Sequence, residues 1–196
     1  SNIWHSFPTF PKLNQESCFL SSTGLANIRE DEGVLTTIES ETYISDVLVH
    51  DPWRPVPSLG GHGAIAAGVF ERSHLDCRFD VLTYTSEPLT ADLYLAGDVA
   101  LEICCSADKK SFDLSAVLSQ VYPDGRVYNL TQGYLHCRDG INHVIRKVQL
   151  QATCAKIAKG NALRLSLSAA CFPAYANNSG TVPNSVRSLD AEVITV

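Results

Sequence analysis

The sequence predicts an all-β domain in which mostly antiparallel strands form a sandwich of the jelly-roll or immunoglobulin kind. Three observations support this class: strand-sized segments rich in Val, Ile, Leu, Thr and Tyr, turn signals at short intervals, and no α-helical periodicity between them. The predicted strands are 42–49, 80–85, 99–105, 114–121, 127–135, 143–150 and 163–168.

Individual elements follow from local patterns. In 163–168, leucine alternates with arginine or serine, which is typical of a strand with one buried face. The turn Pro123-Asp124-Gly125 predicts an antiparallel hairpin, because proline presets the first turn dihedral and glycine supplies a positive φ. A short helix is expected only within 59–70.

The segment 51–57 contains three prolines and cannot donate enough backbone hydrogen bonds for a central strand. We expect an extended surface segment there. It is either a docking surface for another domain or an ordinary rigid loop.

The length, charge and cysteine content of the chain limit the classes of partner and the cellular compartment that we expect. A chain of 196 residues fits one domain, 1–196, and its net charge of −6 with scattered Lys and Arg gives no basic stripe for nucleic acid. The longest apolar runs are too short for a membrane span, and no leader begins the chain. Seven irregularly spaced cysteines indicate reduced thiols and a cytoplasmic protein. The start at Ser1-Asn2 resembles a tag scar, which predicts an excised fragment.

Common catalytic, metal and phosphate motifs are missing from the sequence, so we expect no catalytic residue, no metal and no cofactor. A glycine-rich stretch, 61–66, formally matches a dinucleotide fingerprint but lacks the preceding strand. Further pairs weighed as sites are His50 with Asp51, His74 with Cys77, and His136 with Cys137. Each is more simply explained as a surface or core residue satisfied by hydrogen bonds, and His136 and Cys137, being adjacent in a strand, face opposite ways.

Other residues have a structural and a functional interpretation. Cys104 and Cys105 are expected as small core residues, and the glycosylation acceptors at Asn129 and Asn177 matter only in a secretory cell. Three aromatic residues would suit a sugar platform if they were exposed together, although core or interface burial is more common. They are Trp53, Tyr94 and Tyr175.

The order of short motifs along nearly the whole chain resembles the C-terminal domain of X-Pro dipeptidyl-peptidases and cocaine-esterase-like serine hydrolases. The most specific stretch is Val81-Leu82-Thr83-Tyr84-Thr85-Ser86-Glu87-Pro88-Leu89. The other matching residues are Trp4, 19–24, Asp51-Pro52, 55–57, Gly60-Gly61, 97–99, 123–126, 129–133, 160–168 and 172–177. The chain departs from the family at Ile194-Thr195-Val196, where a histidine-containing segment and a last apolar strand commonly follow, so a strand is expected to be missing.

The resemblance implies a galactose-binding-domain-like jelly roll that follows an α/β-hydrolase domain holding a Ser-His-Asp triad. It implies a non-catalytic accessory role, with docking on that domain of the same chain near the active-site mouth. The parent would then hydrolyse X-Pro peptides, esters or acyl amides, and a homo-oligomer stays open. The docking candidates are His50, Asp51, Trp53, Arg54 and Tyr84. The alternative function is a carbohydrate-binding or protein-binding module, because one fold hosts many functions.

Overall fold

The computed structural model describes residues 6, 8–9, 14–29, 31–61, 67–181 and 190–196. Ser1-Asn2, Trp4 and most of the glycine-rich stretch lie outside these residues. In chain order the elements are β1(Phe19–Ser21), β2(Val34–Thr36), β3(Val49–His50), α1(Ser73–Asp76), β4(Leu82–Thr85), β5(Leu93–Gly97), β6(Ala100–Cys105), β7(Phe112–Val121), β8(Val127–Cys137), β9(Val144–Gln149), β10(Thr153–Ile157), β11(Ala162–Ser168) and β12(Ile194–Thr195).

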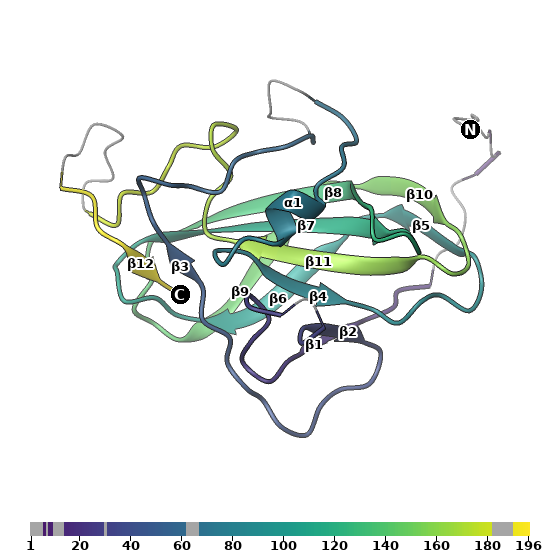
Figure 1. Ribbon diagram of the computed structural model, residues 1–196, viewed down its shortest axis with the longest axis horizontal. Helices are drawn as coiled ribbons and strands as arrows, with labels where there is room; N and C mark the ends of the chain where they lie inside the picture. The colour runs from purple at the N-terminus through teal and green to yellow at the C-terminus, as the bar shows by residue number, and fades with distance from the viewer. Residues whose placement is uncertain (1–5, 7, 10–13, 30, 62–66, 182–189) are drawn as a thin grey trace.

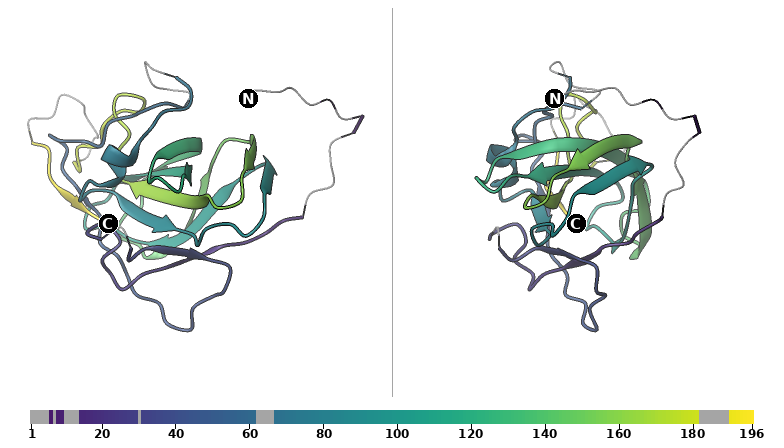
Figure 2. Two further views of the ribbon diagram at one scale, coloured as in Figure 1. Left: turned by 45° about the vertical axis from the view of Figure 1, so that its right-hand side comes forward. Right: turned by 90° about the vertical axis from the view of Figure 1, so that its right-hand side faces the viewer.

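The strands form a β-sandwich, as predicted. A six-stranded sheet has the order β1-β2-β4-β11-β7-β8, and the pairs β10-β5 and β6-β9 lie across the core from it (Figure 1 and Figure 2). The paired strands run antiparallel except for the single β2–β4 contact at Val34 and Thr85. No helix in the described part of the chain is long and apolar enough to cross a membrane.

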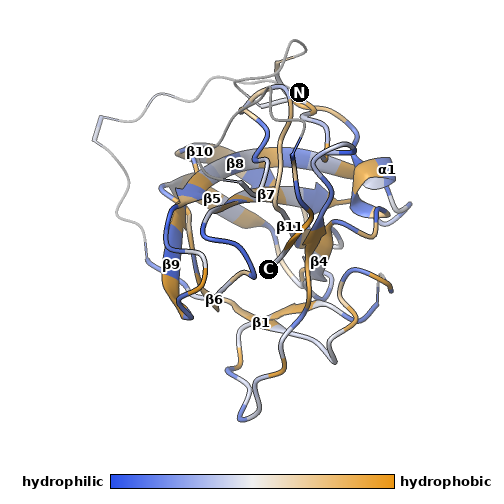
Figure 3. Ribbon diagram, turned by 90° about the vertical axis from the view of Figure 1, so that its left-hand side faces the viewer, coloured by the Kyte–Doolittle hydropathy of each residue, from blue (hydrophilic) through white to orange (hydrophobic). Residues whose placement is uncertain are grey.

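The core lies between the two layers and is built by alternation along β7 and β11. The inward side chains of the two strands meet across the register, in which Leu165 pairs with Leu118 and Leu167 pairs with Ala116. Leu101 of β6 and Val148 of β9 close the cluster from the opposite layer. Polar and apolar residues accordingly alternate along the strands in Figure 3.

The outer face of the six-stranded sheet is polar and nevertheless buried. The hydroxyl-bearing Ser115, Ser119, Ser166 and Ser168 all lie there with almost no solvent exposure. The expectation of a strand with one buried face is therefore wrong for 163–168, whose residues are buried on both sides. The reason is a covering of loops and α1 over this face, which we call the cover layer: residues 51–61, 67–72, α1 and 169–181.

The predicted hairpin is confirmed. β7 and β8 pair antiparallel from Phe112 with Cys137 to Val121 with Val127, and Gly125 in the turn has a φ of 85°. Tyr122 N–H donates to Arg126 O at 2.8 Å, which closes the turn.

Two local expectations are wrong. Segment 42–47 contains no strand, because Tyr43, Ile44 and Val47 are exposed and only β3 forms at its end. Within 59–70 the described residues contain no helix, and the one helix of the described residues, α1, comes just after. Five strands were not predicted, and each of them has five residues or fewer: β1, β2, β5, β10 and β12.

Candidate docking surface

The proline-rich segment 51–57 forms part of the cover layer, where it runs beside the chain that follows β11. Phe172 N–H donates to Val56 O at 3.0 Å and Ser58 N–H donates to Phe172 O at 2.7 Å. Beneath them Val56, Val81 and Ala170 form a small apolar cluster of their own. The segment is thus extended, as expected, and it is fixed to the sheet by hydrogen bonds and packing.

Trp53 projects from this segment into solvent. The Asp51 carboxylate accepts a hydrogen bond from Trp53 N–H at 3.0 Å, and Asp51 O accepts one from Arg54 N–H at 3.0 Å. This Asx turn holds the backbone, while 63% of Trp53 stays exposed. A large aromatic ring left in water on a rigid turn is typical of a surface that another molecule covers.

Phe79 and Val47 extend the apolar surface. Phe79 is 77% exposed and Val47 is 50% exposed. The side-chain amide of Asn27 donates to Val47 O at 3.2 Å and to Phe79 O at 3.1 Å, which fixes the two segments side by side. We call Val47, Trp53, Arg54 and Phe79 the docking patch.

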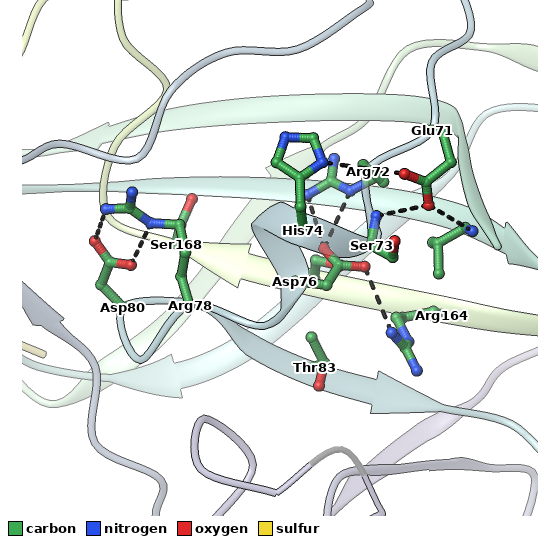
Figure 4. Close-up of polar contacts among 12 residues, drawn as sticks. Glu71, Arg72, Ser73, His74, Asp76, Arg78, Asp80, Thr83, Arg164 and Ser168 are labelled. Carbon is green, nitrogen blue, oxygen red and sulfur yellow. Dashed lines mark hydrogen bonds and ion pairs between the residues drawn. The ribbon is translucent and has the colours of Figure 1, made fainter. Parts of the chain in front are cut away.

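The arginine next to Phe79 links it to the Trp53 turn. Arg78 donates to Arg54 O at 3.0 Å. It also forms two hydrogen bonds with the Asp80 carboxylate at 2.7 and 2.6 Å (Figure 4). Hydrogen bonding to Asp80 raises the pKa of Arg78, and the ion pair at 2.6 Å engages the guanidinium within this chain. Arg54 is exposed, and its guanidinium has no side-chain partner among the described residues, which leaves one positive charge next to Trp53 in the chain.

A buried ion cluster anchors α1, and with it the Phe79 loop, to the sheet. Asp76 Oδ1 accepts hydrogen bonds from Arg72 Nε at 3.1 Å and Ser166 Oγ at 2.9 Å. Asp76 Oδ2 lies 3.7 Å from Arg164 Nη1 (Figure 4). Arg164 Nε donates to Thr85 Oγ1 at 2.8 Å. Because α1 is a single turn without a side-chain cap, these contacts determine its position.

Two of the docking candidates are buried, so their side chains are not available to a partner. His50 on β3 is 2% exposed and its Nε2 lies 3.1 Å from Asn178 O; burial lowers the pKa of this imidazole. Tyr84 points into the core and donates its hydroxyl to Asp46 Oδ2 at 2.7 Å; burial, and then Asp46, raise its pKa. Of the five docking candidates, Asp51 is half-buried and only Trp53 and Arg54 are exposed.

Sequence reasoning missed Phe79 and Val47. A signal existed for Phe79, which stands between charged residues just before a strand. Val47 was assigned to a strand that does not form, so its exposure was not foreseen.

The other candidate pairs do not assemble into sites. Among the described residues, no group of three potential ligands could hold a metal ion. His136 Nδ1 lies 2.6 Å from Asp113 Oδ1, whereas Cys137 is buried on the other face. Exposed His74 lies 4.0 Å from Glu71.

Cysteines and aromatic residues also differ in part from expectation. Cys104 is exposed and only Cys105 is half-buried, so Cys104 is not a core residue.

Tyr94 lies on β5 under Lys156, and Tyr175 stacks on Tyr134 at a centroid distance of 3.9 Å, so neither joins Trp53 in a platform. The Asn129 side chain is buried and bonded to Gly68 O at 3.0 Å.

Solved structures share this fold. An α-amino acid ester hydrolase matches with a TM-score of 0.72 and 20% identity over 91% of this chain and 33% of its own. An aminopeptidase from a marine sediment archaeon, Thaumarchaeota archaeon, matches with a TM-score of 0.75 and 18% identity over 99% of this chain and 36% of its own. The fold thus defines a β-sandwich module that makes up about a third of larger chains.

Sequence comparison gives the family. Residues 1–193 match the model of the X-Pro dipeptidyl-peptidase C-terminal non-catalytic domain. Cocaine esterase from Rhodococcus sp. (strain MB1 Bresler) is 31% identical over 178 residues, which cover 83% of this chain and 31% of that protein. The chain belongs to the family of X-Pro dipeptidyl-peptidase C-terminal non-catalytic domains.

Proposed function

We propose that the chain is the accessory domain of a serine hydrolase and docks through the docking patch on the α/β-hydrolase domain of the same protein, where it helps to shape the active-site entrance. Membership of a non-catalytic domain family, and relatives about three times as long as the chain, support a role that depends on another domain. The single observation that carries the proposal is that the exposed Trp53 and Phe79 lie on two segments joined by the hydrogen bond from Arg78 to Arg54 O, with the exposed Arg54 next to Trp53.

The residue types in the docking patch are those typical of the centre of a protein–protein interface. Tryptophan and arginine contribute most when a partner covers them, and a rigid backbone reduces the entropy lost on docking. The partner surface should be apolar with a carboxylate opposite Arg54. The parent enzyme is proposed to cleave esters or X-Pro peptides, because its family name and its relatives carry those activities in their names.

The test uses the full-length protein that contains this chain, with Trp53→Ala and Phe79→Ala combined. The matched control combines Tyr94→Ala and Ile145→Ala, which are exposed apolar residues outside the patch. Hydrolysis of a nitrophenyl ester and of an X-Pro-nitroanilide, limited proteolysis and thermal unfolding are compared.

We expect the patch variant to be cut faster between the domains and to show a raised KM, with the unfolding transition of this domain unchanged. The control should behave like the wild type. Equal protease resistance and equal KM in the patch variant and the wild type would refute docking through this patch.

A further inference from the structure

A cleft lies at the tip of the β7–β8 hairpin, on the side of the sandwich that carries β10. Its volume is about 400 Å³, which is within the range of small-molecule sites. β10 lies at the opposite end of the sandwich from β3 and the docking patch (Figure 1). The lining residues are Val69, Gln120, Tyr122, Tyr128, Asn129, Leu130, Thr153, Cys154 and Ala155.

Two tyrosines form the aromatic part of the lining, and an arginine packs on the ring of one of them. The Tyr122 and Tyr128 rings meet edge to face, with centroids 5.6 Å apart and planes at 80°. The Arg126 guanidinium lies 5.6 Å from the centroid of the Tyr122 ring. Asp124 pairs with Arg126 at 2.7 Å, which favours the position of the guanidinium over the Tyr122 ring.

A β-bulge shapes the wall of the cleft. Leu118 pairs with Thr131 and Ser119 with Asn129, so Leu130 has no partner on β7. Such an extra residue bends the strand and redirects its side chains. Here it brings Leu130 into the lining beside Tyr128, whose cross-strand partner is Gln120.

The lining carries no acidic or basic side chain. The Gln120 amide and the Thr153 hydroxyl have no hydrogen-bond partner among the described residues, and Asn129 is already bonded to Gly68 O and Phe70 N–H. The cleft therefore offers apolar rings together with neutral donors and acceptors. Arg126, which packs on the Tyr122 ring, is already paired with Asp124, so a phosphate, a carboxylate or a zwitterionic peptide would find no unpaired opposite charge in this lining.

We propose that this cleft binds a neutral saccharide of one or two units. The apolar face of a sugar ring would stack on the tyrosines, while its hydroxyls would bond to Gln120 and Thr153. This site is independent of docking, because none of its residues belongs to the docking patch.

The experiment titrates galactose, lactose, maltose and cellobiose into the full-length protein by calorimetry, with galacturonic acid as the charged counterpart of galactose. The variants are Tyr122→Ala, Tyr128→Ala and Gln120→Ala, and the matched control is Tyr94→Ala, an exposed tyrosine on β5. Gln120→Ala removes a lining amide for which the described residues show no hydrogen-bond partner, so it keeps the test valid if a tyrosine variant unfolds.

We expect saturable binding of at least one neutral sugar, weaker by about ten-fold or more in the tyrosine variants and unchanged in the control. Galacturonic acid should bind more weakly than galactose. The proposal is overturned if no neutral sugar binds at millimolar concentration, or if binding survives all three substitutions. Neither result would affect the docking proposal, which is judged by proteolysis and KM in other variants.

Discussion

The Asp76 carboxylate accepts a hydrogen bond from Arg72 Nε at 3.1 Å, and Arg72 lies one helical turn before it in the chain. Only 1% of the Asp76 side chain is exposed. The same carboxylate also faces the guanidinium of Arg164, so one buried negative charge is shared by two buried positive charges. Removing a buried acid is costly because the remaining charges lose their partner in a poorly solvated place.

Asp76→Asn should therefore lower the free energy of unfolding by about 3–5 kcal/mol. Urea denaturation of the chain measures this. Asp124→Asn, which breaks the exposed pair with Arg126, should leave the urea midpoint almost unchanged. Similar midpoints for the two variants would show that the buried cluster does not stabilise α1.

The pH dependence of stability should contain a contribution from His50. Burial lowers the pKa of His50 in the folded state, and this effect outweighs the nearby charges of Asp113, Asp80 and Asp51. The unfolded chain then binds the proton more readily, so stability is full above the unfolded pKa of about 6.5 and falls as pH decreases below it.

In His50→Gln this part of the decrease should disappear, since glutamine keeps a donor for Asn178 O without titrating. Urea denaturation at several pH values below and above 6.5 compares the two proteins. If wild type and variant lose stability equally as pH falls, His50 is not responsible.

Gly133 on β8 is expected to tolerate no side chain. A Cβ there would lie 2.4 Å from Gln149 O, in the backbone of the neighbouring layer. Gly133→Ala should cost about 1–3 kcal/mol or more of unfolding free energy, because two backbones must separate. The control, Gly125→Asn, places a residue that tolerates a positive φ in an open turn, and should cost less than about 1 kcal/mol. Equal thermal midpoints for both would contradict the close approach.

Cys77 should report docking directly. It is exposed and lies two residues before Phe79, whereas Cys104 and Cys154 are exposed on β6 and β10. Thiol labelling of the isolated chain should modify all three quickly, and labelling of the full-length protein should slow at Cys77 alone. Buried Cys137, whose pKa is raised to about 11 by burial, should react only after unfolding. Unchanged labelling of Cys77 in the full-length protein would count against the docking patch.

The sequence predicted the long strands because their two faces differ in polarity or because a strong turn joins them. The hairpin at Gly125 and the alternation in 163–168 are examples. Short strands such as β1 and β2, of three residues each, are determined by tertiary pairing and carry little local signal.

The candidate site was harder to predict for the same reason. Tyr84 and His50 are polar residues whose partners, Asp46 and Asn178, lie 38 and 128 positions away, so a local pattern cannot show that they are buried. Trp53 was identified because the prolines around it exclude a strand. Its grouping with Phe79 depends on Arg78 and Asn27, and only the folded chain brings them together.

The contact between Ser166 and Asp76 joins positions 90 residues apart. During synthesis on the ribosome, α1 would emerge long before β11, the strand that fixes it. The hydrogen bond between Phe172 N–H and Val56 O would likewise form only after Phe172 had been added. The surface that carries Trp53 and Phe79 can therefore take its final shape only after most of the sandwich has been made. We expect that a nascent chain cannot dock early on the proposed α/β-hydrolase domain. Docking would then occur only with copies of this domain that have been synthesised and folded completely.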